Sequence, residues 1–210
     1  MLFREHLYQL SIDALESLEI AQSNNKVAKN PLSENHFFSV WVSKALKEKL
    51  CDVTMMPLLK QWQQRARTQG AGAHLKSEFE LIKQTYQGLN NTDHVITKAQ
   101  IERVIESLTT LDWQINIESH ISKKHSVKKE KHSSLVIAHH SLNDAFNAEG
   151  VLLSPISFFV RGDSKGFVDS AYKQALLVFK VTDYKSIVKF HGEFIIAPNN
   201  NFTNIPEFII

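Results

Sequence analysis

The hydrophobic period of the chain changes near residue 111, and this change limits the folds open to it. Up to residue 111, apolar residues recur every three to four positions, as they do on the buried faces of helices. From residue 113, the run WQINIES alternates apolar and polar side chains, as a half-buried strand does. We therefore predict an α+β protein, with an all-α helical bundle at 1–111 and a smaller α+β domain at 112–210.

The first part contains helical segments with recognisable ends. Asn30 can cap a helix that has Pro31 at its first position, or Ser33 can cap it slightly later. Thr97 and Gln100 form a T-x-x-Q capping box, which predicts the start of another helix. The predicted helices cover about 2–22, 31–50, 52–69, 74–87 and 97–111.

The stretch 30–86 holds Trp41 and Trp62 and organises the predicted bundle. The segment around Trp41 is apolar over more than one stripe, which is typical of a helix covered on several sides. We expect the two tryptophans to be buried in one shared core.

The second part alternates strand and helix patterns. Strands are predicted at 113–119, 134–140, 151–162, 176–181 and 186–198, with helices at 141–150 and 163–175. This order favours a mostly antiparallel sheet with helices on one face. The polar run 120–134 is interpreted as an exposed loop or hairpin tip, with little apolar content to anchor it.

Charge and cysteine content narrow the function classes. The net charge is +2, and each predicted domain carries +1, from 13 basic and 12 acidic residues before the boundary and 11 and 10 after it. Neither domain has the basic excess of a dedicated nucleic-acid binder. Cys51 is the only cysteine, so neither an intrachain disulfide nor a cysteine zinc cage can form.

The densest basic cluster is a candidate contact for an anion or a nucleic acid. It contains Lys123, Lys124, Lys128, Lys129 and Lys131. Phosphates could gain affinity there through counterion release. However, no aromatic residue is interleaved in the run for base stacking. A solvated loop is therefore the favoured interpretation.

The histidines provide a third hypothesis, an enzyme with a site assembled from dispersed residues. His139, His191 and Asp183 are the candidates in the second domain. No His-x-x-x-His pattern occurs, so no metal-binding motif supports this hypothesis. The sequence predicts no metal site and no cofactor.

The run GAGAH at 70–74 lies between a helix end and a helix start. Backbone amides at such a helix N-terminus can hold an anion, although a plain helix–helix turn also explains the glycines. A helix-turn-helix that offers His74, Lys76 and Ser77 to a groove is another interpretation. Acidic Glu78 and Glu80 on the same helix argue against it.

Two segments carry a resemblance to a known family. The pattern N-P-x-x-E-N-H-F-x-x-x-W-x-x-x-A-L-K spans 30–47, and RTQGAGAHLK spans 67–76. They resemble a bacterial domain family of unknown function, number twenty-nine thirteen, and a looser likeness continues through 113–150. The resemblance implies a small bacterial cytoplasmic protein, often encoded on accessory DNA, and no assigned activity.

The sequence favours a non-catalytic protein-interaction or regulatory module that binds a protein partner or itself. The apolar tail 202–210 supports this hypothesis, because an apolar end rarely stays free in water. Nucleic-acid binding and catalysis are the alternatives. The N-terminus lacks the apolar core of a signal peptide, and no apolar run is long enough for a membrane span, so we expect a cytoplasmic protein.

Overall fold

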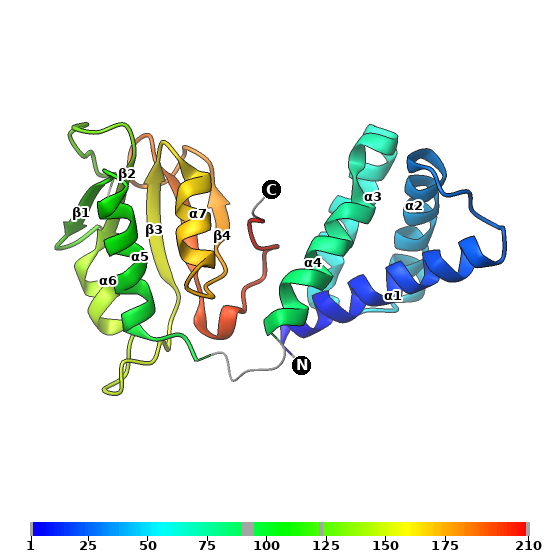
Figure 1. Ribbon diagram of the computed structural model, residues 1–210, viewed down its shortest axis with the longest axis horizontal. Coiled ribbons are helices and arrows are strands. Elements are labelled where there is room, and N and C mark those ends of the chain that lie inside the picture. The colour runs from blue at the N-terminus through cyan, green and yellow to red at the C-terminus, as the bar shows by residue number, and fades with distance from the viewer. Residues whose placement is uncertain (1, 90–94, 122–123, 209–210) are drawn as a thin grey trace. The chain divides into compact units, whose positions relative to one another are not determined.

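The computed structural model describes residues 2–89, 95–121 and 124–208 (Figure 1). The chain is α+β and forms two compact units, residues 1–92 and 93–210. The division therefore lies earlier than the boundary predicted at 111, and the second unit is the larger one. The helix that begins after Thr97 lies in the second unit, together with the sheet.

Within its described residues, the N-terminal unit consists of helices. They are α1 (Phe3–Ser23), α2 (Pro31–Glu48), α3 (Met56–Gln69) and α4 (Leu75–Leu89), with 3-10 turns η1 (Val53–Met55) and η2 (Gly70–Ala73). Helix α1 packs on α4, and α2 packs on α3. Asn30 caps α2 as predicted, since its side-chain oxygen accepts a 2.9 Å hydrogen bond from the Ser33 amide.

Phe79 of α4 lies at the centre of the core of this unit. The Trp62 ring centroid lies 4.8 Å from that of Phe79, and the Trp41 centroid lies 6.4 Å from it. The two tryptophans thus share one aromatic cluster, as predicted. Only Trp62 is fully buried, with 1% of its surface exposed, whereas Trp41 is half-buried. Trp41 is thus less deeply buried than Trp62.

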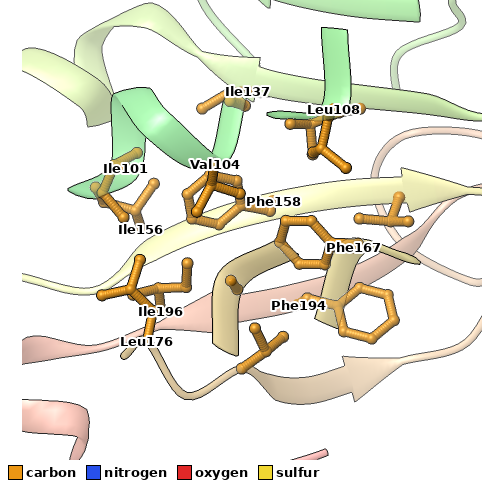
Figure 2. Close-up of a cluster of buried hydrophobic side chains, with 14 of the residues drawn as sticks. Ile101, Val104, Leu108, Ile137, Ile156, Phe158, Phe167, Leu176, Phe194 and Ile196 are labelled. Carbon is orange, nitrogen blue, oxygen red and sulfur yellow. The ribbon is translucent and has the colours of Figure 1, made fainter. Parts of the chain in front are cut away.

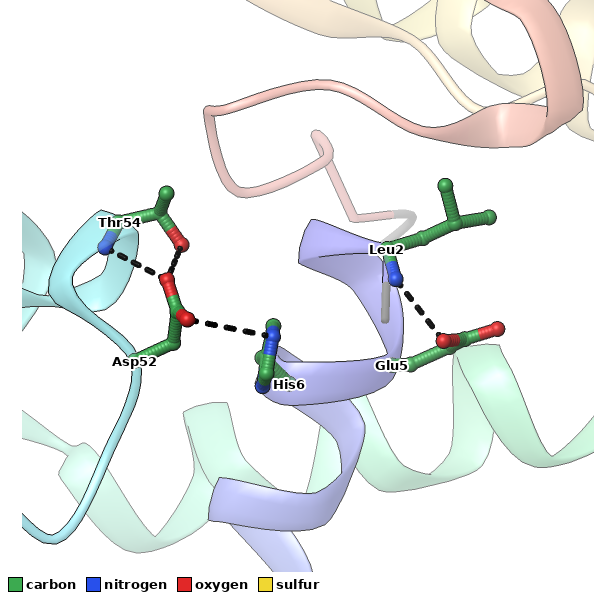
Figure 3. A network of polar contacts seen from close by, with 5 residues as sticks. All are labelled: Leu2, Glu5, His6, Asp52 and Thr54. Carbon is green, nitrogen blue, oxygen red and sulfur yellow. Dashed lines mark hydrogen bonds and ion pairs between the residues drawn. The ribbon is translucent and has the colours of Figure 1, made fainter.

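A small polar network joins the start of α1 to the turn before α3 (Figure 3). Asp52 accepts hydrogen bonds from the Thr54 hydroxyl (2.7 Å) and amide (2.9 Å), and these bonds hold the pKa of Asp52 below its ordinary value. Its other carboxylate oxygen lies 3.7 Å from His6 of α1. Asp52 therefore caps η1, which leads into α3, rather than capping α3 directly.

The C-terminal unit is built on a five-stranded sheet of described residues, in the order β1-β2-β3-β5-β4. The strands are β1 (Gln114–Glu118), β2 (Ser134–Ala138), β3 (Ile156–Arg161), β4 (Phe179–Thr182) and β5 (Gly192–Ile196). The helices are α5 (Lys98–Thr110), α6 (His139–Asp144) and α7 (Ser164–Tyr172). Three strand pairings are antiparallel and the β1–β2 pairing is parallel, so the sheet is mostly antiparallel, as predicted.

Helix α5 belongs to the second unit, where it packs on the sheet beside α7 (Figure 1). Its apolar stripe of Ile101, Val104 and Leu108 lies over the strands and shares a core with Phe158 and Phe167 (Figure 2). This stripe could pack either on a helical bundle or on a sheet, because helical periodicity shows that a helix has a buried face without showing what covers it. The bundle predicted for 1–111 therefore lacks its fifth helix.

The capping residues at the start of α5 also act as predicted. The Gln100 side-chain oxygen accepts hydrogen bonds from the Thr97 amide (2.8 Å) and hydroxyl (3.0 Å). The Gln100 amide nitrogen in turn donates to the carbonyl of Gln174, beyond α7 (2.9 Å). One side chain thus closes the N-terminus of α5 and ties it to the neighbouring layer.

The connection between β1 and β2 covers the second face of the sheet. We call its described residues, 119–121 and 124–133, the crossing segment. Ile121 and Val127 pack against Val136 and Phe159, whose side chains point away from α5 and α7. The interpretation as a hairpin tip is wrong, because parallel strands cannot be joined by a tight hairpin and need a crossover.

The described part of the C-terminal tail packs on the sheet edge. The Phe202 ring lies 5.5 Å from that of Phe179 in β4, and the Glu207 amide donates a 2.8 Å hydrogen bond to the Val178 carbonyl. The apolar character of residues 202–208 thus serves the fold. The expectation of an exposed apolar tail is wrong for these residues.

We expect Trp62→Ala to lower the free energy of unfolding by about 3–5 kcal/mol, as large core truncations do. Trp41→Ala should cost distinctly less, because the Trp41 ring keeps part of its surface in water. Urea unfolding followed by helical circular dichroism measures both. Equal losses for the two variants would contradict the assignment of Trp62 to the centre of the core.

Gln100→Ala should destabilise the C-terminal unit more than Thr97→Ala, which should cost about 1 kcal/mol as a lost cap. The reason is that Gln100 makes both the cap and the link to the Gln174 carbonyl. The comparison needs only the unfolding midpoints of the two variants. A Thr97 variant that is the less stable of the two would contradict it.

Candidate functional site

The loop between β4 and β5 exposes large side chains. Tyr184 is 70% exposed, Phe190 71% and Ile187 44%, while Lys185 and Lys189 are also exposed. Apolar side chains of this size are normally buried, so a cluster of them on one loop marks a candidate contact surface. The strand predicted at 186–198 begins only at Gly192, and the preceding residues form this loop.

This loop pairs with the crossing segment. His125 and Val188 form a parallel bridge, in which the His125 amide donates to the Ile187 carbonyl (2.8 Å) and the Lys189 amide donates to the His125 carbonyl (2.9 Å). Val188 is fully buried and faces the sheet, so its neighbours Ile187 and Lys189 face outward. The bridge brings two segments that are distant in sequence into one surface.

We call this the aromatic-basic surface. It consists of Lys124, Lys128 and Lys129 from the crossing segment and Tyr184, Lys185, Ile187, Lys189 and Phe190 from the β4–β5 loop. Residues 124–132 and 183–190 hold six lysines against Glu130 and Asp183, a net charge of +4 with histidine neutral. The net charge of the whole chain is small, but these two segments together create a local positive field.

The predicted basic residues are only partly available in this surface. Lys131 is bound, since its ammonium lies 2.6 Å from the Asp112 carboxylate. Lys124, Lys128 and Lys129 are exposed, as expected for a solvated segment. Lys123 lies outside the described residues. The segment as a whole is held in place: the Gln114 side chain donates to the Lys128 carbonyl (2.9 Å) and accepts from the Glu130 amide (3.0 Å).

Phe190 is held outward by a strained backbone. Its φ of 62° lies in the left-handed region, where a bulky residue is an outlier. The residues on both sides are anchored. The Lys189 amide donates a hydrogen bond to the His125 carbonyl, and His191 is completely buried. Strain that the surroundings maintain is a recognised feature of functional sites.

His191 forms the buried support beneath the loop. Its Nδ1 lies 2.7 Å from the Lys189 carbonyl, and a carbonyl can only accept, so Nδ1 carries the proton. Nε2 therefore accepts the 2.8 Å hydrogen bond from the Ser134 hydroxyl. Burial is the main cause that lowers the pKa of His191, and the charge of Arg161 adds to it.

Arg161 lies in the same row of the sheet as Ser134 and His191. It pairs with Ser134 across β2 and β3, and it lies one residue beyond the paired Val160 and Gly192. Its Nε and Nη2 atoms are buried and have no hydrogen-bond partner in the described part of the chain. Arg161 is half-buried and adds a positive charge to this row of the sheet.

The dispersed catalytic candidates do not gather into one site. His139 is exposed at the start of α6, directly after β2. The partner of His191 is Ser134, which lies at the opposite end of β2. The exposed Asp183 carboxylate pairs with Lys180, at 2.5 Å. Among the residues that the structure describes, no three histidine, cysteine or acidic side chains gather in a group that could hold a metal ion.

Tyr184 and Phe190 were missed as functional candidates in the sequence. The pattern predicts a strand at 186–198 that includes Phe190, and it leaves Tyr184 in the short link between this strand and the one at 176–181. The adjoining pairs Tyr184–Lys185 and Lys189–Phe190 were the available signal, since aromatic and basic residues alternate where single-stranded nucleic acid binds.

Residues 2–209 match the model of the family described as "Protein of unknown function (DUF2913)", and the chain belongs to that family. No curated protein and no solved structure matches the chain. Among the described residues, no helix is both long enough and apolar enough to cross a membrane.

Lowering the pH should destabilise the chain through His191. Because its pKa is depressed in the folded state, the unfolded state binds more protons below about pH 6.5, and stability falls as the pH drops towards the folded pKa. His191→Gln should reduce the difference in unfolding free energy between about pH 7.5 and about pH 5.5. His132→Gln, at an exposed position of the crossing segment, is the control and should leave that difference unchanged. Equal pH responses of wild type and His191→Gln would contradict this role.

Proposed function

We propose that this chain is a non-catalytic binding module that holds single-stranded nucleic acid on the aromatic-basic surface. The observation that carries the proposal is the bridge between His125 and Val188. It joins the loop that exposes Tyr184 and Phe190 to the segment that exposes Lys124, Lys128 and Lys129. The absence of interleaved aromatics, which weakened this hypothesis in the sequence, does not apply to the folded surface.

Each part of the surface suits one part of a nucleic-acid strand. Lysine ammonium groups neutralise phosphates and release counterions, which gives affinity without sequence preference. Exposed aromatic rings offer stacking platforms for bases, and every base has a face that can stack. Bases are accessible in this way only where they are unpaired, so a single strand is the fitting partner.

The lysines of the surface are available for this purpose. Lys124, Lys128, Lys129, Lys185 and Lys189 form no ion pair with other described residues, whereas Lys131 and Lys180 are paired with Asp112 and Asp183. The hydrogen bond to Asp183 also raises the pKa of Lys180, so this ammonium stays charged. Asp112 and Asp183 are therefore neutralised by lysines that are not part of the surface, whereas Glu118 lies 3.6 Å from His125 and Glu130 forms no ion pair with other described residues.

Protein binding is a weaker candidate for the same surface. Its support in the sequence was the apolar tail, and residues 202–208 of that tail pack on the sheet edge. Val181 and Ile187, each 44% exposed, would suit an apolar partner. The surrounding lysines favour an anionic partner instead, because an apolar interface core is poor in lysine.

Fluorescence anisotropy with a labelled single strand of about 12 nucleotides tests the proposal. We expect binding at about 50 mM salt that weakens towards about 200 mM, with a slope of log K against log salt near −2 if about three phosphates are contacted. Replacement of Lys124, Lys128 and Lys129 by glutamine should abolish most of that slope. Replacement of Lys26, Lys29 and Lys60, which are exposed in the other unit, is the charge-matched control.

The aromatic contribution has its own control. Tyr184→Ala with Phe190→Ala should weaken binding roughly tenfold or more, since stacking contributes about 1–3 kcal/mol per base. Tyr172→Ala, at a 44% exposed position on α7, should have no effect. The proposal fails if wild type does not bind at about 50 mM salt, or if both lysine triples weaken binding equally.

A further inference from the structure

A small pocket lies where the starts of α2 and α4 meet in the N-terminal unit. It has a volume of about 130 Å³ and is lined by Glu34 and Asn35 of α2, by Ala71 of η2, and by His74, Lys76 and Ser77 at the start of α4. The two segments that carry the family resemblance, 30–47 and 67–76, thus supply most of one pocket. This pocket is separate from the aromatic-basic surface and has no part in the proposed function.

The α4 side of the pocket offers hydrogen-bond donors. The first helical hydrogen bond of α4 runs from the Glu78 amide to the His74 carbonyl (3.1 Å). The amides of Leu75, Lys76 and Ser77 precede it and have no carbonyl partner within the helix. The preceding His74 has left-handed backbone angles, φ 49° and ψ 32°. The 15-residue α4 also directs the positive end of its dipole here.

The α2 side of the pocket contributes an unpaired acceptor. Asn35 is 9% exposed, and its Oδ1 atom is enclosed without a hydrogen-bond partner among the described residues. A buried acceptor without a donor is costly and rare in native proteins. Because Asn35 lines the pocket, a molecule bound there can supply the missing donor.

Glu34 sets the charge of this wall. One of its carboxylate oxygens receives the Lys76 ammonium (2.9 Å) and the Gln22 amide (2.8 Å). The ion pair neutralises the carboxylate in part, and its other oxygen remains an acceptor. The Lys76 ammonium therefore pairs with Glu34. In this position it does not point to a DNA groove, as the helix-turn-helix interpretation requires. Glu34, His74 and Lys76 are the titratable groups of the pocket lining.

Donors on one side and acceptors on the other define the class of ligand. The amides and the helix dipole favour an oxyanion, as at other helix N-termini. The Asn35 and Glu34 oxygens require that the same molecule donate a proton. A volume of about 130 Å³ equals that of about four water molecules and is far below that of a drug-sized site. We propose that the pocket binds a phosphate group that carries a proton, either free hydrogen phosphate or a protonated monoester.

Thermal unfolding of the full chain with inorganic phosphate tests this site, because a ligand of the folded state raises Tm by mass action. We expect phosphate at about 10 mM to raise Tm, and sulfate at equal ionic strength to raise it much less, because sulfate has no O–H for Asn35. Equal shifts with the two anions would overturn the proposal, as would no shift with phosphate.

Two pocket variants and one control outside the pocket locate the site. Ser77→Asp places a carboxylate at the start of α4, where the helix dipole stabilises it, so the variant should fold well and lose the phosphate shift. Gln61→Asp, at an exposed position of α3 outside the pocket lining, adds the same charge and should keep the shift. Asn35→Leu should make the responses to phosphate and sulfate alike. A phosphate shift that Ser77→Asp leaves unchanged overturns the proposal.

Phenyl phosphate, a phosphate monoester, distinguishes binding of a protonated monoester from binding of free hydrogen phosphate. Phenyl phosphate loses its last proton near pH 6, so it should raise Tm at about pH 5.5 and hardly at about pH 7.5, whereas inorganic phosphate keeps a proton at both. Sulfate measured at both pH values reports any gain caused by protonation of His74 alone. A stronger response to phenyl phosphate at the higher pH would contradict the requirement for a donated proton.

Discussion

The parallel pairing of β1 with β2 determines how the rest of the C-terminal unit is arranged. Parallel neighbours need a connection that returns along the sheet, and here no helix fills that connection in the described residues. Ile121 and Val127 hold the connection on the face that α5 and α7 leave uncovered. The same path carries the lysines past the β4–β5 loop and makes the bridge at His125. One strand orientation thus produces the second core and the aromatic-basic surface together.

Local sequence signals predicted the elements well and their partners less well. The Asn30 cap, the Thr97–Gln100 box and the order of strands and helices follow from spacing within short windows. The placement of α5 does not, because Ile101, Val104 and Leu108 form a stripe that either a bundle or a sheet could cover. The tail shows the same limit, since composition identified Phe202 as apolar without indicating that Phe179 would receive it.

The candidate sites were less predictable because they depend on pairing between distant segments. The lysines were visible as a cluster, but their aromatic neighbours come from a loop some 60 residues later, joined through one bridge. The Ser134–His191 hydrogen bond spans 57 positions and had no motif. The pocket of the N-terminal unit was predicted only in part. The amides of the 70–74 turn suggested an anion, whereas the unpaired Asn35 oxygen appeared only in the fold.

The central claim is that the bridge between His125 and Val188 fixes the crossing segment beside the β4–β5 loop. Amide hydrogen exchange at His125 and Lys189 in the full chain tests it most directly, because these two amides donate the bridging hydrogen bonds. If the bridge is formed, both amides should exchange much more slowly than those of the neighbouring exposed residues Lys124 and Lys185. Exchange of both amides at the rate of an unstructured chain would show that the two segments are independent, and the aromatic-basic surface would not exist as described.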